Sequence, residues 1–184
     1  MWNKNKKKLE DNKTHIDLLL EKFMVNDEFI NKKKVAIIDC DGIISNNEFL
    51  YDTNGKSMKS YGCYDHEMIS FCKKYLNWEF IFVSADANGF KITENRVKDL
   101  HCSIYNFNWQ ERSDLVKEYR NNQDYITLFI GDSISDINAM SNADISATVN
   151  NAPDLVKEYC DYISDKNGGY GGLADILYNI NYNI

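Results

Sequence analysis

The chain has 184 residues, 43% of them hydrophobic and 27% charged, which is typical of a soluble globular protein with one hydrophobic core. Its formal net charge of −7 argues against nucleic acid or an anionic membrane as a partner. The sequence has no apolar stretch long enough to span a bilayer and no signal-peptide pattern, so we expect a cytoplasmic protein. The five cysteines form no C-x-x-C pair and are expected to be reduced thiols.

The first predicted element is an amphipathic helix that begins near Thr14, the expected N-cap. The apolar residues of "THIDLLLEKFM" recur at helical spacing: Ile16, Leu19, Leu20 and Phe23. We assign residues 1–33 to an N-terminal extension that contains this helix, and residues 34–184 to the main domain.

Strands and helices then alternate along the chain. "VAIIDCDGII" (35–44) opens with the apolar run of a buried strand, and residues 48–61 indicate a β-hairpin with an Asn-Gly turn. Further strands are expected at 80–86, 102–107, 125–132 and 145–149, and helices at 66–76, 91–100, 109–121, 136–144, 152–160 and 173–180. The helix at 152–160 is expected to open with Pro153, the only proline.

This order of elements predicts an α/β fold. We expect a doubly wound, mostly parallel (Rossmann-like) sheet with a β-hairpin insertion. The hairpin and one helix occupy most of the chain between Asp41 and Ser84, so no separate cap domain is expected there.

Acidic residues follow two of the predicted strands. Asp39 and Asp41 follow the first strand, while Asp132 and Asp136 follow the strand at 125–132. Ligands of open α/β sheets bind at the carboxyl ends of strands, so these side chains and Ser84 could share one site. Clustered carboxylates repel one another unless a cation lies between them, and an oxygen-only site suits Mg²⁺. The sequence therefore predicts a magnesium site.

Such a site permits phosphoryl transfer. A carboxylate can attack phosphorus to form an aspartyl-phosphate, and a second carboxylate can protonate the departing alcohol and then activate water. The hydroxyl of Ser84 and neighbouring backbone N–H groups, including that of Ala85, could bind the phosphate oxygens. Arg112, at the start of a predicted helix, is the candidate positive side chain.

The same residues resemble the four motifs of the haloacid dehalogenase superfamily: "DCDG", Ser84 after an apolar strand, a basic residue before a helix, and "GDSISD". Within it, residues 34–180 look most like the small capless 3-deoxy-D-manno-octulosonate 8-phosphate phosphatases and their relatives that act on nonulosonate 9-phosphates. The segments "EFLYDTNGKSMKSY", "YDHEMI", "APDLVKEYCDYIS" and "GGYGG" carry this resemblance.

The resemblance implies a role for each residue. Asp39 would be the nucleophile and a magnesium ligand, and Asp41 the acid/base, with its backbone carbonyl on magnesium. Asp132 would complete the metal ligands and Asp136 would support them. Ser84, Ala85 and Arg112 would bind the phosphate. The resemblance also implies a homotetramer assembled through the hairpin, in which a neighbouring subunit closes each active site.

Three departures from the family pattern concern specificity. Arg112 stands where relatives usually carry lysine, and the two side chains bind anions with different geometry. Ala85 and Asp86 replace the usual Gly-Arg or Gly-Glu. The segment 64–66, Tyr-Asp-His, replaces Arg-Asp-Gly. Fewer cations would therefore face an acidic substrate.

Two other classes of protein are alternatives to a phosphatase. A receiver domain would carry adjacent acids on its first strand, which the D-x-D spacing does not match. A catalytically weak or idle oligomerisation module of sugar-nucleotide synthesis remains the alternative, favoured by "SAD" (84–86) and Arg112 and opposed by the intact motif acids. The leading hypothesis is a magnesium-dependent phosphatase for an acidic sugar phosphate in lipopolysaccharide or capsule biosynthesis.

Overall fold

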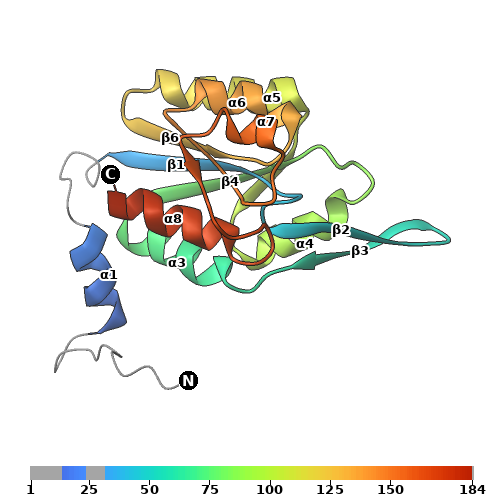
Figure 1. Ribbon diagram of the computed structural model, residues 1–184, viewed down its shortest axis with the longest axis horizontal. Coiled ribbons are helices and arrows are strands. Elements are labelled where there is room, and N and C mark those ends of the chain that lie inside the picture. The colour runs from blue at the N-terminus through green and yellow to red at the C-terminus, as the bar shows by residue number, and fades with distance from the viewer. Residues whose placement is uncertain (1–13, 24–31, 184) are drawn as a thin grey trace.

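The computed structural model describes residues 14–23 and 32–183, and its centre is a six-stranded sheet (Figure 1). Neighbouring strands all pair in parallel, in the order β5-β4-β1-β6-β7-β8. The strands are β1 (Lys33–Asp39), β4 (Trp78–Ser84), β5 (Ser103–Asn106), β6 (Tyr125–Ile130), β7 (Ile145–Thr148) and β8 (Tyr162–Ile163). The predicted doubly wound α/β sheet is confirmed.

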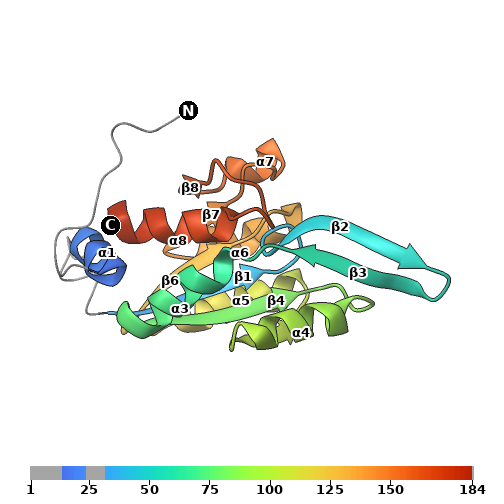
Figure 2. The ribbon, with the colours of Figure 1, turned by 90° about the horizontal axis from the view of Figure 1, so that it is seen from below.

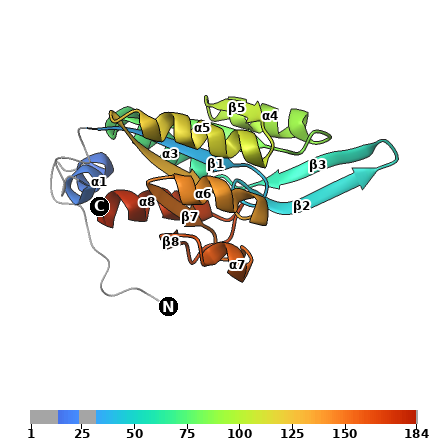
Figure 3. The ribbon, with the colours of Figure 1, turned by 90° about the horizontal axis from the view of Figure 1, so that it is seen from above.

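Helices cover both faces of the sheet. They are α1 (His15–Phe23), α3 (Asp65–Tyr75), α4 (Phe90–Asp99), α5 (Trp109–Asn121), the 3-10 helix η1 (Ile134–Asp136), α6 (Ile137–Asn142), α7 (Asp154–Lys157) and α8 (Gly172–Asn183). Helices α3 and α8 lie on one face, seen from below in Figure 2, and α5 and α6 lie on the other, seen from above in Figure 3. The central strands β1, β4 and β6 are mostly buried between these layers.

Strand β1 shows why this sheet needs helices on both faces. Val35 and Ile37 belong to the core cluster beneath α5 and α6, while Ala36 and Ile38 belong to the cluster beneath α3 and α8. All four side chains are fully buried. A continuous apolar run is therefore required, because successive residues of a strand point to opposite faces.

The predicted hairpin is confirmed as a separate two-stranded antiparallel sheet of β2 (Ser45–Asp52) and β3 (Gly55–Tyr61). It projects beyond the carboxyl end of β1 (Figure 1). Gly55 has a φ of +117°, which suits glycine at the turn. In the fully described segment between β1 and β4, the hairpin and α3 are the only elements, so no cap domain is present there.

The amphipathic N-terminal helix is also confirmed, as α1. The hydroxyl of Thr14 accepts the N–H of Asp17 at 3.2 Å, and the Asp17 carboxylate accepts the N–H of Thr14 at 2.8 Å, which is a reciprocal N-terminal cap. Phe23 packs edge-on against Phe71 and Tyr178, with ring centroids 5.9 and 5.4 Å away. The rest of the predicted extension (1–13 and 24–31) lies outside the described residues, and its boundary at residue 33 stays a prediction.

Two details differ from the sequence prediction. The helix expected at 152–160 is shorter, spanning Asp154–Lys157, and Pro153 is its N-cap instead of its first helical residue. The two-residue edge strand β8 was not predicted, because two residues carry no measurable alternation. Among residues 14–23 and 32–183, no helix combines the length and apolar character needed to cross a membrane.

Candidate active site

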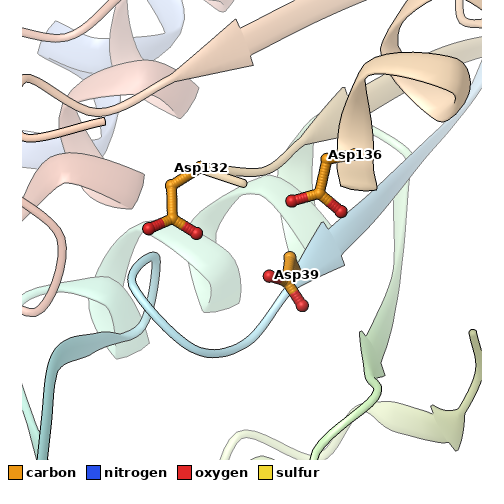
Figure 4. A group of neighbouring side chains, drawn as sticks. All are labelled: Asp39, Asp132 and Asp136. Carbon is orange, nitrogen blue, oxygen red and sulfur yellow. The ribbon is translucent and has the colours of Figure 1, made fainter. Parts of the chain in front are cut away.

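Three buried carboxylates meet where β1 and β6 end (Figure 4). Asp39 ends β1, Asp132 follows β6 by two residues, and Asp136 lies in η1. One carboxylate oxygen from each residue lies within 4.8 Å of the others. The strands β1 and β6 are adjacent and parallel, so their carboxyl ends necessarily meet at this edge. We call Asp39, Asp132 and Asp136 the carboxylate trio.

The trio carries an electrostatic cost that points to a cation. Burial, and then repulsion from Asp136, raises the pKa of Asp39 well above its ordinary value. Burial, with repulsion from Asp136 and Asp41, raises the pKa of Asp132 to about 7. A divalent cation would remove this repulsion, and a donor set made only of oxygen atoms fits Mg²⁺. The residues present therefore fit the predicted metal.

Arg112 is brought into this site from the first turn of α5. Its Nη1 donates to Asp136 Oδ1 at 2.5 Å and lies 3.3 Å from Asp39 Oδ1, while its Nε donates to the carbonyl of Phe107. Asn108 caps the helix through a capping box and so fixes where α5 begins. The guanidinium is buried and faces Asp39 and Asp136, while the phosphate-binding role predicted for Arg112 stays a prediction.

Asp41 lies near the trio, but its side chain is not part of it. The Nζ atom of Lys59 lies 2.8 Å from Asp41 Oδ1 and 2.9 Å from Asp41 Oδ2. The hydroxyl of Ser84 lies 3.5 Å from Asp41 Oδ2. The acid/base role predicted for the side chain stays a prediction. The predicted contact between the backbone carbonyl and magnesium stays a prediction.

Ser84 and Ala85, the residues predicted to bind the phosphate, lie at the carboxyl end of β4. Ser84 ends β4, next to β1 in the sheet, and its buried hydroxyl accepts the N–H of Asp86 at 3.2 Å. Ala85 follows in an exposed loop. Asp86 binds Lys56 and Lys59, and these contacts lower the pKa of its carboxyl to about 2 although burial opposes them.

The hairpin lysines were missed by the sequence prediction. In the sequence, Lys56 and Lys59 are two of many lysines. The hairpin is predicted from its apolar residues Phe49, Tyr51, Met58 and Tyr61. In the structure Met58 is 57% exposed, whereas the side chain of Lys59 is fully buried. Burial alternates from Met58 to Tyr61 along β3, so Lys59 and Tyr61 share the inward face, and alternation counted from Tyr61 would have found Lys59.

Asn47 is a second residue that the sequence prediction missed. Its Nδ2 donates to Asp132 Oδ2 at 3.3 Å, and its φ is +64°. Gly42 approaches the same carboxylate, since a Cβ at Gly42 would lie 2.0 Å from Asp132 Oδ2. Gly42 in the loop after β1 and Asn47 near the start of β2 therefore both approach the carboxylate of Asp132.

The glycine-rich segment before α8 packs against this same loop of its own chain. A Cβ at Gly168 would lie 1.6 Å from the carbonyl oxygen of Gly42. The N–H of Gly169 donates to the carbonyl of Ile43 at 2.9 Å. These glycines let two backbone segments touch directly.

The segment 64–66 makes structural contacts. Asp65 is buried, and its carboxylate accepts the N–H of Ala174 at the start of α8. His66 lies in a groove along α3, together with Ile16 and Tyr75. Asp65 thus joins α3 to α8, and His66 is exposed.

Comparison with known proteins places this geometry in a family. The model of the haloacid dehalogenase-like hydrolases matches residues 3–177, and the chain belongs to that family. It is a phosphatase, a phosphomonoester hydrolase, of that family.

Individual relatives point to one branch. The chain is 26% identical over 147 residues to the 3-deoxy-D-manno-octulosonate 8-phosphate phosphatase KdsC of Haemophilus influenzae, covering 78% of this chain and 79% of that protein. The cobalt-bound structure of the deoxy-D-mannose-octulosonate 8-phosphate phosphatase YrbI from Haemophilus influenzae matches with a TM-score of 0.70 at 22% identity, covering 83% of this chain and 91% of that one.

A third relative was solved with ligands. The 3-deoxy-D-manno-octulosonate 8-phosphate phosphatase of Moraxella catarrhalis, in complex with magnesium, phosphate and a KDO molecule, matches with a TM-score of 0.70 at 20% identity, covering 86% of this chain and 88% of that one. At these identities the two structures support the shared fold.

Proposed function

We propose that this protein is a magnesium-dependent phosphatase that acts through an aspartyl-phosphate on Asp39. The observation that carries the proposal is the carboxylate trio with Arg112 Nη1 3.3 Å from Asp39 Oδ1. A buried nucleophilic carboxylate beside a fixed cation and an oxygen-only metal site is suited to attack on a phosphate ester.

Asp39, Asp132 and the backbone carbonyl of Asp41 would hold Mg²⁺, and Asp136 would support them. When bound, the ion supplies positive charge that neutralises the phosphate oxygens and the carboxylates. Arg112 Nη1 already contacts Asp136 and lies beside Asp39, so it orients both carboxylates.

The reaction divides into two steps. An oxygen of Asp39 attacks phosphorus, the bond from phosphorus to the ester oxygen breaks, and Asp41, which is protonated at the start of this step, donates its proton to the leaving alcohol. Asp41 then takes a proton from water, which attacks the same phosphorus. Inorganic phosphate leaves and the carboxylate of Asp39 is restored. Ser84, Ala85 and Arg112 bind the phosphate oxygens throughout.

The proposed substrate is an acidic sugar phosphate such as 3-deoxy-D-manno-octulosonate 8-phosphate or a nonulosonate 9-phosphate. Support comes from the 26% identity to the Haemophilus influenzae phosphatase and from the fold of the Moraxella catarrhalis enzyme solved with KDO. Lys56 and Lys59 are both engaged by Asp86, so a substrate carboxylate would need a cation from elsewhere.

We further propose that the hairpins pair around a closed ring to form a homotetramer. Leu50, Tyr51 and Met58 are 56%, 68% and 57% exposed on a two-stranded sheet, which is marginally stable in water without a partner. In a closed assembly these residues would be buried, and neighbouring subunits would cover each active site in place of a cap.

The test is phosphate release from a panel of phosphorylated sugars and sugar acids, with Mg²⁺ and after exhaustive chelation. We expect release from sugar-acid phosphates that requires Mg²⁺ and returns when the ion is restored. Undiminished hydrolysis after chelation would contradict the metal assignment. Preference for neutral sugar phosphates would contradict the substrate class, and no release from any ester would favour the idle module.

A further inference from the structure

Lys59 joins the hairpin to the active site through one buried ammonium group. Its Nζ lies 2.8 and 2.9 Å from the two oxygens of Asp41, 2.8 Å from the hydroxyl of Thr93 and 2.7 Å from Asp86 Oδ2. The side chain of Lys59 is fully buried. An ammonium has three N–H donors, and here three separate segments receive them: the loop after β1, the loop after β4, and α4.

The position of Asp86 is in turn fixed. Its Oδ1 accepts the N–H of Gly89 at 3.1 Å, and its Oδ2 binds Lys56 at 2.5 Å as well as Lys59. When Asp41 is ionised, the two carboxylates of Asp41 and Asp86 balance the two ammonium groups of Lys56 and Lys59. This balance explains how a lysine can be buried here, since an unpaired buried charge would be costly.

We propose that Lys59 is a positioning residue that holds the carboxylate of Asp41 outside the carboxylate trio, turned toward the leaving group. This inference rests on the proposed function, in which Asp41 exchanges protons with the substrate. Without Lys59, the Asp41 side chain is free to rotate toward the carboxylate trio, since Asp39 of the trio precedes Asp41 by only two residues in the chain. Proton transfer requires hydrogen-bond distance, and a misplacement of about 1 Å can cost about 100-fold in rate.

Lys56 provides a matched control. It lies on the same strand, binds the same oxygen of Asp86 and contacts the ring of Phe49, with Nζ 3.8 Å from the ring centroid. No contact between Lys56 and Asp41 exists among the described ion pairs. Lys56→Met therefore removes the same charge and weakens the same hairpin attachment, but it leaves Asp41 held.

The experiment compares Lys59→Met with Lys56→Met, using an alkyl phosphate and p-nitrophenyl phosphate. For the alkyl ester we expect Lys59→Met to lower kcat about 100-fold with KM nearly unchanged, and Lys56→Met to stay within about threefold of the parent. With p-nitrophenyl phosphate, whose leaving group needs no proton, Lys59→Met should release a burst of one nitrophenolate per site, followed by slow turnover.

A double-mutant cycle separates positioning from an independent role. In an Asp41→Asn background, Lys59→Met should have no further effect on kcat. Crystal structures supply a readout other than activity: the Asp41 side chain should turn toward Asp39 in Lys59→Met and keep its place in Lys56→Met. If Lys59→Met does not fold, Lys59→Gln, which keeps a donor without the charge, replaces it.

Each outcome decides the inference. Equal losses in Lys56→Met and Lys59→Met, additive effects with Asp41→Asn, or an unmoved Asp41 would overturn the positioning role while leaving the phosphatase proposal intact. A parent protein that hydrolyses no phosphate ester with Mg²⁺ would overturn both.

Discussion

Single residues at the ends of β1 and β6 carry most of the chemistry and most of the unfavourable charge. Burial raises the pKa of both Asp39 and Asp132, and repulsion from Asp136 adds to it. The groups that serve the reaction therefore destabilise the protein when no cation is bound. This opposition between activity and stability can be measured at one residue.

Asp39→Asn tests the nucleophile and the charge cost together. We expect phosphate release to fall by about 10⁴-fold or more, because a neutral amide cannot attack phosphorus. In chelator the variant should unfold at a higher temperature than the parent, since one of three repelling carboxylates is gone. Each kcal/mol corresponds to about 2–4 °C in Tm for a chain of this size.

The control is Asp154→Asn on α7, whose side chain is 98% exposed. It should change neither activity nor the Tm appreciably, because the charge of an exposed carboxylate is already solvated. Parent-like turnover by Asp39→Asn, in a preparation free of other phosphatases, would refute the mechanism.

Asp65 lets the pH dependence of stability be traced to one buried group. Burial raises its pKa from 3.8 to about 6, although the Ala174 N–H and Arg96 lower it. Between about pH 4 and 6 the folded state holds a proton that the unfolded state has lost. Stability contributed by this group is therefore present at low pH and decreases as pH rises through about 6.

Asp65→Asn should remove that slope while keeping an acceptor for Ala174. Urea unfolding of parent and variant from pH 4 to 7 measures the difference in unfolding free energy. From pH 4 to pH 7 we expect the unfolding free energy of the variant to rise relative to that of the parent by at most about 3 kcal/mol. This value corresponds to the difference between the pKa of Asp65 in the unfolded and in the folded protein. Parallel curves across this range would mean that Asp65 does not titrate as described.

At the scale of elements, loops that touch through glycines determine where the active-site residues lie. Gly168 contacts the loop after β1 so closely that a Cβ would lie 1.6 Å from the oxygen of Gly42. The same loop carries Asp41 and approaches Asp132. Packing between β1, β2 and the segment before α8 is therefore coupled to the geometry of the trio.

Gly168→Ala should consequently destabilise the protein by about 3 kcal/mol and reduce activity. The new Cβ would collide with the backbone of Gly42, which cannot move aside as the end of a flexible side chain can. The comparison is Gly171→Ala. Gly171 has a φ of +92°, but a Cβ there would lie 3.6 Å from Cδ2 of Tyr64, which is an ordinary contact, so Gly171→Ala measures left-handed backbone strain alone, about 1–2 kcal/mol. Equal unfolding free energies for the two variants would contradict the close contact.

At the scale of the whole molecule, the exposed hairpin predicts assembly. Light scattering at micromolar concentration should give a mass about four times the 21.4 kDa of one chain. Leu50→Lys with Met58→Lys should produce monomers with lower activity and selectivity, because both side chains would be buried in the ring. A parent monomer that is fully active and selective would refute the shared site.

Leu155→Lys is the matched control for the hairpin variants. Leu155 is 46% exposed on α7, so it has a comparable apolar exposure on an element far along the chain from the hairpin. It should leave the mass unchanged. Dissociation by this variant as well would indicate that the hairpin is not the principal interface.

The sequence by itself determined the fold class and the place of the carboxylate trio at the ends of β1 and β6. Apolar runs such as 35–38 and 125–130 are required wherever a parallel strand is covered on both faces, so local composition is enough to locate β1 and β6. Asp39 and Asp132 follow those runs, and parallel pairing brings the strand ends together. The short β8 escaped prediction because its position depends on pairing with β7 and on no local pattern.

Only the tertiary structure decided which lysines bind Asp41 and Asp86. Leu50 and Tyr51 of β2 pair with Met58 and Lys56 of β3, so Ser57 is an extra residue in the ladder. This register shift places Lys56 and Lys59, three positions apart, beside the same oxygen of Asp86, whereas regular alternation would place them on opposite faces. The position of this one-residue bulge depends on packing between distant parts of the chain. The local sequence pattern therefore does not predict it.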